Sequence, residues 1–455
     1  MSTMEVKDKA EIRALYMKAY EDSKEAVDAR IADGIETNRK GNCKVVLTDK
    51  NGTPLAGKKV RINQTNHDFN FGANIFLLDE FDNAEDNAAY RELFKKHFNA
   101  ATVPFYWNSL EPEENKPRYG KDSPKVYRRP APDLCVEYCH DNNIRTKLHC
   151  LVYDKFVPAW LTEMNEEEVL AKYEKRFKEI ADRYTGKMFE FEVINEILQM
   201  YFWNRYSCST VFDKKDIGEW AFKLARKYFP NETLVLNDGN LFAEISEKKH
   251  FSNFYMLCEN LIMKGAEIDK IGMQHHLFSG TAADSQEEYE HDVKSGVMWN
   301  NPNKLFEMLD VLSDFNVPLE ITEITVPTFG PTEEDELLQA DMLKLWLSVF
   351  FSHPSVNTAV YWNTIDGYAY DDPNGSWNEN NCRGGLWHRD LTPKKSADML
   401  YDLIHNVWHT EVELTTDENG VAEFRGFYGD YEVDIDGVKS SIGNHKDGDI
   451  QTVVI

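Results

Sequence analysis

The sequence predicts an α/β protein: a parallel (β/α)8 TIM barrel with a small accessory β-sandwich built from the N- and C-terminal segments. Eight short apolar segments alternate with charged, helix-forming stretches across residues 68–408, which is the pattern of a parallel barrel. One further group of strand and turn signals precedes this region and another follows it. Neither group has enough strands to bury a face alone, so we expect the two groups to share one sandwich.

Taken in chain order, residues 1–40 form a helical leader. Residues 5–37 are rich in charged helix formers and poor in apolar positions, which predicts one long, mostly solvated helix.

Residues 41–67 and 409–455 have the same arrangement of strand and turn signals. In the first segment, apolar residues 45–47 precede a turn at 49–52, and Val60 and Ile62 then alternate with polar residues. In the second, a turn at 416–420 precedes residues 421–424 and the alternating positions Tyr431, Val433 and Ile435. Read end to end, the two segments resemble one prealbumin-like β-sandwich repeat. The alternative is two separate β extensions. No exposed aromatic row is present, so a bracing role is favoured over carbohydrate binding.

Residues 68–408 form the predicted catalytic barrel. Its eight strands are expected at 69–75, 100–105, 144–150, 189–195, 233–236, 270–274, 318–322 and 359–363. In such a barrel, functional side chains lie where the strands end and the βα loops begin.

Composition excludes several classes of protein. The 455 residues include 51 Lys and Arg against 78 Asp and Glu, a net charge of −27, which argues against nucleic-acid and anionic-membrane partners. No apolar run is long enough for a membrane helix. The charged start MSTMEVKDKAEIR lacks a signal-peptide core. We expect a cytoplasmic protein, or a secreted one whose signal has been removed. The oligomeric state stays open.

The sequence predicts no metal and no cofactor. The seven cysteines are scattered without metal-ligand spacing, and Cys135 and Cys139 are expected to be two ordinary buried thiols in a reducing compartment. Neither a phosphate-binding glycine loop nor a GxSxG serine-hydrolase turn is present.

Two glutamates end predicted barrel strands. Glu196 closes FEFEVINE and Glu323 lies in VPLEITEITVP. Either one alone is most simply a solvated acid. Together they suit a glycosidase that uses one protonated acid and one ionised nucleophile.

Three further strand ends carry side chains that suit a sugar site. In IGMQHHLF, His275 and His276 face opposite ways, so one of them is expected to enter the barrel mouth and hydrogen-bond a carboxylate. They lack the helical spacing of a metal pair. His149 suits a sugar hydroxyl, and Trp362 suits the floor beneath a sugar ring.

With these residues placed, the chain resembles the glycoside hydrolase family 10 endo-β-1,4-xylanases over about residues 68–408. VINE resembles the family's V-V-N-E, which implies that Glu196 is the general acid/base and that Asn195 binds the sugar 2-hydroxyl. ITEIT resembles I-T-E-L-D, which implies that Glu323 is the nucleophile. IGMQHHL resembles I-G-x-Q-x-H and implies Gln274 and His276 as site residues, with His276 bound to the nucleophile.

Three more motifs match those of the family, and two others differ from the family's pattern. LHCLVYD implies His149, LNDGN implies Asn237, and VYWNTIDGYAY implies Trp362, with Tyr370 where a second Trp is usual. The departures lie where the family grips the non-reducing side of xylan. Val103 and Tyr106 replace its Asn and Lys, and Tyr153-Asp154 replaces its Trp-His, so Tyr106 and Tyr153 are expected to contact the substrate there.

The resemblance implies a retaining endo-β-1,4-glycosidase of xylanase type, acting on β-1,4-xylan or xylo-oligosaccharides. It also implies an ionised Glu323 and a raised pKa for Glu196. The alternatives are a glycosidase for another β-linked glycan or glycoside, a non-catalytic glycan-binding barrel, and a metal-dependent barrel hydrolase using His275 and His276. The surplus of acids favours a neutral or cationic substrate over glucuronylated xylan, unless Lys or Arg line the rebuilt subsites.

Overall fold

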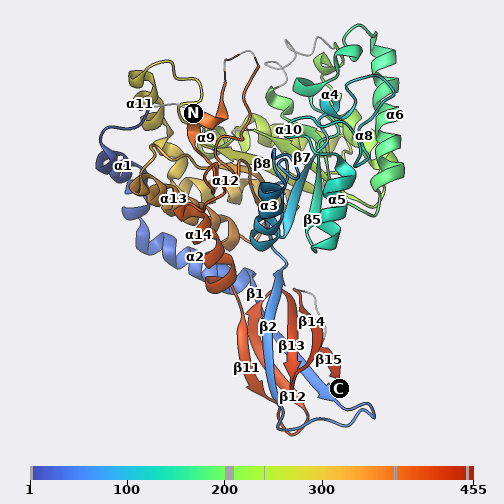
Figure 1. Cartoon of the computed structure of the whole chain (residues 1–455), viewed down its shortest axis with the longest axis vertical. Coiled ribbons are helices and arrows are strands. Elements are labelled where there is room, and N and C mark those ends of the chain that lie inside the picture. Colours follow the sequence, from blue (N-terminus) through green and yellow to red (C-terminus); the bar gives the residue numbers. More distant parts are fainter. Residues whose placement is uncertain (1–3, 200–209, 240, 374, 376, 447–449) are drawn as a thin grey trace.

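A computed structural model of the chain describes residues 4–199, 210–239, 241–373, 375, 377–446 and 450–455. Eight parallel strands close into a barrel, and a unit of two sheets lies beneath it (Figure 1). The barrel strands are β3 (Asn70–Asn74), β4 (Ala100–Pro104), β5 (Arg145–His149), β6 (Glu190–Asn195), β7 (Thr233–Asp238), β8 (Lys270–His276), β9 (Leu319–Thr325) and β10 (Val356–Tyr361). All eight predicted strands are present, which confirms the (β/α)8 fold.

Helices surround the barrel, as Figure 1 shows. Those that follow barrel strands are α3 (Ala84–His97), α4 (Trp107–Leu110), α5 (Pro132–Asp141), α6 (Glu166–Tyr184), α8 (Ile217–Tyr228), α9 (Phe242–Lys248), α10 (Asn253–Met263), α11 (Gln286–Ser295), α12 (Pro302–Leu312), α13 (Glu333–Ser352) and α14 (Lys395–Asp402). The side chains of Asn165 and Thr332 form capping boxes that begin α6 and α13, because each satisfies backbone N–H groups of the first turn.

The helical leader differs from the prediction. Two helices, α1 (Lys9–Glu21) and α2 (Lys24–Asn38), replace the single helix expected over residues 5–37. A few of its apolar side chains pack on the barrel, while most of its positions stay exposed or half-buried, as predicted. Tyr16 is fully buried and its hydroxyl donates to the backbone oxygen of Val293 at 2.7 Å, while Ile12 and Val27 are buried too. Few apolar positions sufficed, because the large apolar side chains of the leader pack against the barrel core.

The two terminal segments share both sheets of the β-sandwich, so they are not separate extensions. One sheet has the order β12-β1-β15 and the other β11-β2-β13-β14. Figure 1 shows the blue N-terminal strands lying among red C-terminal ones. The strands are β1 (Lys40–Thr48), β2 (Lys59–His67), β11 (Glu411–Thr415), β12 (Val421–Phe427), β13 (Gly429–Ile435), β14 (Val438–Asn444) and β15 (Gln451–Val454). Val45, Ile62 and Val433 are fully buried in its own small core.

The sandwich joins the barrel at the N-terminal ends of the barrel strands. Strand β2 ends at His67 and leads directly into β3, while Trp408 stacks on Phe351 with ring centroids 4.3 Å apart just before β11 begins. Functional side chains of such barrels lie at the opposite, C-terminal ends. The bracing role predicted for the sandwich is consistent with this position and stays a prediction, as do the exact domain boundaries.

Alternation along β6 places its acids inside the barrel. Phe191 packs outward against Phe229 with ring centroids 4.4 Å apart, while Glu190 and Glu192 point inward to lysines of neighbouring strands. Phe189, the first residue of the predicted strand 189–195, precedes β6 and is 61% exposed.

The described cysteines are all free and buried, which confirms the prediction for Cys135 and Cys139; Cys208 lies outside the described residues. In the part of the chain that is described, no helix has the length and apolar composition needed to cross a bilayer.

Candidate active site

A cleft of about 610 Å³ opens at the C-terminal ends of the barrel strands. Its walls include ten of the eleven residues expected from the sequence: Tyr106, His149, Tyr153, Asn195, Glu196, Gln274, His276, Glu323, Trp362 and Tyr370. The eleventh, Asn237, is fully buried and hydrogen-bonds cleft residues through its amide. Residues separated by up to 264 positions in the sequence therefore meet in one site, because their strands all end at the same face.

Glu196 follows the last residue of β6 and adopts a φ of +55°, in the left-handed region. Its backbone N–H donates to the oxygen of Asn237 at 3.0 Å, which ties this turn to β7. Its Oε2 accepts the hydroxyl of Tyr153 at 2.7 Å. A strained backbone that neighbouring strands hold in place is common at functional sites, and here it turns the carboxylate into the cleft.

Glu323 lies deeper than Glu196 and is 4% exposed. The imidazole Nε2 of His276 lies 3.1 Å from its Oε2, and the amide of Asn237 lies 3.4 Å from its Oε1. Thr322, beside it on β9, donates to Asn237 at 2.7 Å and so orients that amide. The carboxylate of Glu323 is therefore held on both oxygens.

The side-chain amide of Gln274 joins the two carboxylates. Its Nε2 lies 3.0 Å from Glu196 Oε1 and 3.1 Å from Glu323 Oε1. Because one nitrogen reaches both atoms, these oxygens are at most about 6 Å apart. Retaining glycosidases place their carboxyl groups about 5–5.5 Å apart and inverting enzymes about 6.5–9.5 Å apart. The geometry favours the retaining arrangement.

Burial raises the pKa of Glu323 to about 8, and the nearby charges of Glu192 and Glu196 act in the same direction. The resemblance implies an ionised Glu323, but in the structure its deep position disfavours the charged form. Glu323 therefore retains a proton near neutral pH when no sugar is bound.

This pKa shift predicts that Glu323 costs stability as the pH rises. Between its ordinary pKa of 4.5 and the folded value of about 8, the folded protein holds a proton that the unfolded chain has released. Stability contributed by this group is therefore lost across that window. Relative to wild type, Glu323→Gln should gain about 1–3 kcal/mol in free energy of unfolding between pH 5 and pH 8, measured by urea denaturation at each pH. The exposed-acid control Glu334→Gln should show no such trend, and a difference independent of pH for Glu323→Gln would contradict the shift.

The two adjacent histidines of β8 face opposite sides, as alternation predicts. His276 enters the cleft and contacts Glu323 and, through Nδ1, the hydroxyl of Thr325 at 2.9 Å. His275 packs outside the barrel against Trp346, with ring centroids 4.2 Å apart. Burial lowers the pKa of His276 to about 4, so this imidazole is neutral. It can donate Nε2–H to an ionised Glu323 while Nδ1 accepts from Thr325. The two imidazoles do not form a metal-binding pair.

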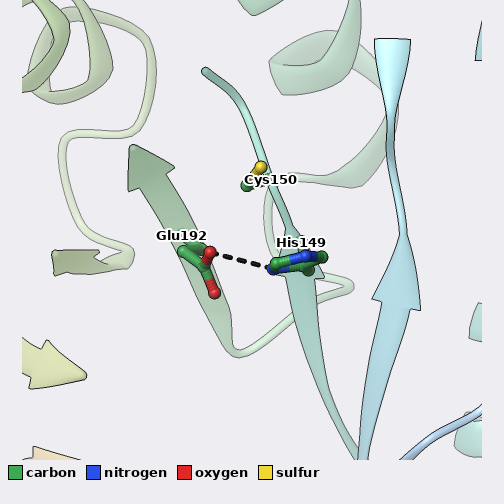
Figure 2. Close-up of side chains that lie close together, drawn as sticks. All are labelled: His149, Cys150 and Glu192. Carbon is green, nitrogen blue, oxygen red and sulfur yellow. Dashed lines mark hydrogen bonds and ion pairs between the residues drawn. The ribbon is translucent and has the colours of Figure 1, made fainter. Parts of the chain in front are cut away.

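His149, Cys150 and Glu192 are the one group of three possible metal ligands among the described residues (Figure 2). Both ring nitrogens of His149 are already engaged, Nδ1 with Glu192 at 2.8 Å and Nε2 with the hydroxyl of Tyr106 at 2.9 Å. Burial raises the pKa of the Cys150 thiol well above its ordinary value, which disfavours the thiolate that a metal needs. These contacts orient His149 at the cleft and do not fit a metal.

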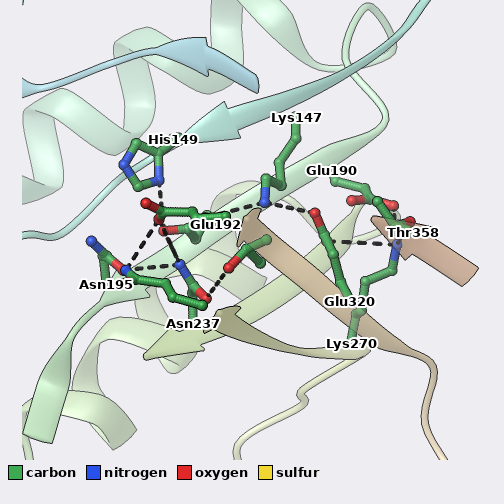
Figure 3. A network of polar contacts seen from close by, with 12 residues as sticks. Lys147, His149, Glu190, Glu192, Asn195, Asn237, Lys270, Glu320 and Thr358 are labelled. Carbon is green, nitrogen blue, oxygen red and sulfur yellow. Dashed lines mark hydrogen bonds and ion pairs between the residues drawn. The ribbon is translucent and has the colours of Figure 1, made fainter. Parts of the chain in front are cut away.

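A layer of buried charges lies inside the barrel beneath the site (Figure 3). Lys147 Nζ lies 2.7 Å from Glu320 and 3.5 Å from Glu192, and Glu192 in turn contacts His149. Burial opposes the charge of Lys147, but the carboxylates of Glu320 and Glu192 raise its pKa. This layer was not predicted from the sequence, although the alternation of Glu with Phe and Val in FEFEVIN is a signal for it.

Lys147→Met should be strongly destabilising, because it leaves Glu192 and Glu320 buried without their nearest lysine. Loss of one partner from a buried ion pair costs about 3–5 kcal/mol, and we expect this decrease in the free energy of unfolding by urea denaturation. The exposed control Lys59→Met should change it by less than about 0.5 kcal/mol. Equal effects of the two variants would contradict a structural role for the charged layer.

The walls of the cleft are mainly aromatic. Trp362 contacts Phe76 with ring centroids 5.2 Å apart and lies edge-on to His149. Tyr106, Tyr153 and Phe156 pack on one another in the wall formed by the β4 and β5 loops. Other residues that line the cleft were not predicted from the sequence: Phe76, Asn108, Arg128, Arg129, Lys155, Phe156, Gln199, Gly239, Phe278, Asp372, Pro373, Trp377 and Glu379. Most lie in long βα loops, whose conformation follows no periodic pattern.

In (β/α)8 proteins, a closely spaced pair of carboxylates at the strand ends is typical of glycoside hydrolases. The chain belongs to glycosyl hydrolase family 10, whose family model matches residues 64–403.

Curated relatives are consistent with this assignment. Endo-1,4-beta-xylanase 2 of Arabidopsis thaliana is 25% identical over 405 residues, covering 87% of this chain and 32% of that protein. Anti-sigma-I factor RsgI6 of Acetivibrio thermocellus is also 25% identical over 405 residues, covering 87% of this chain and 45% of its own length. The Beta-1,4-xylanase of Dictyoglomus thermophilum is 26% identical over 333 residues, covering 70% of this chain and 81% of that protein. The chain spans less than half the length of the first curated relatives it matches.

The fold is also that of a solved structure. Xylanase 10B from Thermotoga petrophila RKU-1, in complex with xylobiose, superposes with a TM-score of 0.57 at 20% sequence identity. The match covers 74% of this chain and 94% of that one. The part that it leaves uncovered is comparable in size to the leader and the sandwich together.

Proposed function

We propose that the chain is a retaining endo-β-1,4-glycosidase of xylanase type, acting on β-1,4-xylan or xylo-oligosaccharides. The observation that carries the proposal is the Gln274 amide that contacts both carboxylates. It brings two carboxylate oxygens within about 6 Å of each other, below the roughly 6.5–9.5 Å that is typical of inverting enzymes, and so supports a retaining mechanism. The xylanase relatives and the family membership support the choice of xylan.

In this mechanism Glu196 protonates the glycosidic oxygen while Glu323 attacks the anomeric carbon and forms a covalent glycosyl-enzyme. Water, deprotonated by Glu196, then releases the sugar with its configuration retained. Asn195, whose amide lies 3.5 Å from Glu196 Oε1, is placed to bind the sugar 2-hydroxyl. The remaining cleft residues, His149, Tyr106, Tyr153, Trp362 and Tyr370, contact the sugar chain.

In the protein without sugar, Glu323 carries a proton that it has to lose before it can attack the anomeric carbon. Burial favours it on Glu323, whereas attack requires Glu323 to be ionised and Glu196 to be the acid. The positive charge that develops at the anomeric carbon favours an ionised Glu323, and the neutral His276 stabilises that form by donating from Nε2 at 3.1 Å. Transfer of the proton to Glu196 therefore accompanies sugar binding in this proposal.

A second substrate class follows from the rebuilt wall of the cleft. Tyr106 and Tyr153 are almost completely buried and bind His149 and Glu196 through their hydroxyls. Because both hydroxyls are engaged, these tyrosines offer a sugar the exposed edges of their rings and few hydrogen-bond donors. The alternative substrate is therefore another β-linked glycan, or a β-glycoside with an apolar substituent.

The stereochemistry of the first product tests the mechanism. Proton NMR during hydrolysis of xylan should show the β-anomer first and the α-anomer only after mutarotation; the α-anomer first would contradict retention. A parallel screen of xylan, arabinoxylan, mixed-linkage glucan and aryl β-glycosides identifies the glycan. Reducing sugar from none of them would favour the non-catalytic glycan-binding alternative.

A further inference from the structure

Three cationic side chains line the cleft wall formed by the loops after β4 and β5. Arg128 and Arg129 lie shortly before α5, and Lys155 lies in the short helix Asp154–Phe156. The same wall contains Tyr106 and Tyr153, the two tyrosines that replace the family's usual residues. The chain as a whole carries a net charge of −27, so cations gathered at the site require an explanation.

Arg129 keeps most of its hydrogen-bond donors unused. Its guanidinium lies 4.0 Å above the ring of Tyr106 and 5.2 Å from that of Phe76. Within the described residues, its one hydrogen bond goes to the backbone oxygen of Arg128 at 2.9 Å, and no carboxylate forms an ion pair with it. Burial lowers its pKa to about 10, which still leaves it charged at neutral pH. Arg129 is half-buried at the cleft, and a partly desolvated charge without a counter-ion is costly unless a ligand supplies one.

Arg128 holds this wall in place and adds a second unused donor. It is 5% exposed, and its Nη atoms donate to the backbone oxygen of Tyr368 and, at 3.2 Å, to Asn363 Oδ1. Its Nε is buried and has no partner among the described residues. Its φ of +58° is in the left-handed region, a strain that is common at ligand-binding positions.

In the described part of the chain, no ion pair joins Glu323 or Glu379 to these arginines, although the charge of Glu379 favours the charged form of Arg129. Glu196 and Glu323 are held by the contacts already described, and Glu379 accepts the amide of Asn363 at 2.7 Å. The Arg129 guanidinium therefore keeps donors for an anion in the cleft, whereas the Nη atoms of Arg128 are engaged in holding the wall.

We propose that this wall binds a carboxylate of the substrate, so that the enzyme acts on β-linked glycans that bear a uronic acid near the cleavage point. The proposal rests on the proposed function and specifies its substrate class. Arginine presents parallel N–H groups that match a carboxylate in a bidentate contact. Lys155, 5.1 Å above the ring of Tyr370, adds a positive potential across the same cleft.

The position of Arg129 sets where the acidic sugar lies. The Tyr106 ring separates Arg129 from His149, and the Tyr106 hydroxyl contacts His149 at 2.9 Å. Tyr153, 6.3 Å from Tyr106 between ring centroids, contacts Glu196. The carboxylate therefore binds on the side of the cleft that Tyr106 and Tyr153 line. By resemblance, this side holds the part of the sugar chain that is non-reducing to the cleavage point.

The test compares a xylo-oligosaccharide carrying one glucuronic acid with the same compound after reduction of its carboxyl group to an alcohol. In the wild-type enzyme, kcat/KM should be at least tenfold higher for the acid. Arg129→Gln should lower this ratio at least tenfold, and Arg129→Lys, which keeps the charge without the planar fork, should lower it less. The matched variant Arg61→Gln, on the sandwich at an exposed position, should keep the wild-type ratio. A wild-type ratio near one, or a ratio unchanged in Arg129→Gln, overturns the proposal.

A binding measurement separates this inference from the proposed function. Calorimetry with Glu323→Gln, in which the arginines are intact, should show at least tenfold tighter binding of the acidic oligosaccharide than of its reduced form. Tighter binding of the acid without hydrolysis by the wild type would overturn the glycosidase proposal and support the carboxylate site. Hydrolysis of both compounds with equal binding would overturn the carboxylate site alone. If Arg129→Gln does not fold, the proposal is still decided by two other measurements. These are the kcat/KM ratio of the wild type and the binding ratio of Glu323→Gln for the acidic and the reduced oligosaccharide.

Discussion

Replacing Glu323 by alanine is expected to lower kcat on an aryl β-xyloside by about 10⁴-fold or more while sugar binding remains measurable by calorimetry. The nucleophile is lost, but Gln274, His276 and the aromatic walls remain in place. The space left by the carboxylate admits a small anion. Added azide should therefore attack the anomeric carbon directly and give the α-glycosyl azide, with inversion at that carbon.

The control for this experiment is Glu334→Ala, which removes an exposed acid on α13 and should leave kcat within twofold of wild type. Hydrolysis retained by Glu323→Ala would contradict its role as nucleophile. A β-glycosyl azide would instead assign that role to another residue.

Replacing Glu196 by glutamine should have an effect that depends on the leaving group. A general acid contributes about 10²–10⁴-fold to the rate, so hydrolysis of xylan should slow by that factor. A dinitrophenyl β-xyloside needs no protonation of its leaving group, so its first step should be nearly as fast as in wild type. Deglycosylation lacks its base, and stopped-flow absorbance should record a burst of dinitrophenolate followed by slow turnover.

Mass spectrometry during the slow phase should detect the glycosyl adduct on the peptide that contains Glu323. Azide should accelerate turnover of Glu196→Gln and give the β-glycosyl azide, the opposite anomer to that from Glu323→Ala. Equal slowing of both substrates would contradict the acid/base role.

Tyr153→Phe is the matched positioning variant, because it removes the hydroxyl that contacts Glu196 at 2.7 Å. It should shift the pH profile of kcat/KM. Unlike Glu196→Gln, it should show no burst of dinitrophenolate, because its acid/base is still present.

The strands and the acids could be predicted because they depend on local pattern. Apolar segments such as residues 318–322 form strands, and strand ends in a parallel barrel meet at one face. Glu196 and Glu323 therefore could be assigned to one cleft before any distance was known. Alternation along a strand likewise predicted that only one of His275 and His276 enters it.

The leader shows the opposite case. Residues 5–37 have few apolar positions, and a count of them predicts a solvated helix. The break between α1 and α2 and the burial of Tyr16 depend on the shape of the barrel surface that the helices meet. Such complementarity involves residues nearly 300 positions away, such as Val293, and has no local signature.

By itself, the sequence determined the eight-stranded barrel and the two carboxylates at the strand ends, since periodicity and strand order are local properties. Only the tertiary structure decided that the terminal segments pair in one sandwich instead of forming separate extensions. It also decided that Gln274 contacts both carboxylates, that burial raises the pKa of Glu323, and that the guanidinium of Arg129 lies over the ring of Tyr106. These features depend on distances and desolvation between residues far apart in the chain. Side-chain spacing in three dimensions sets them, and no pattern along one strand or loop contains that information.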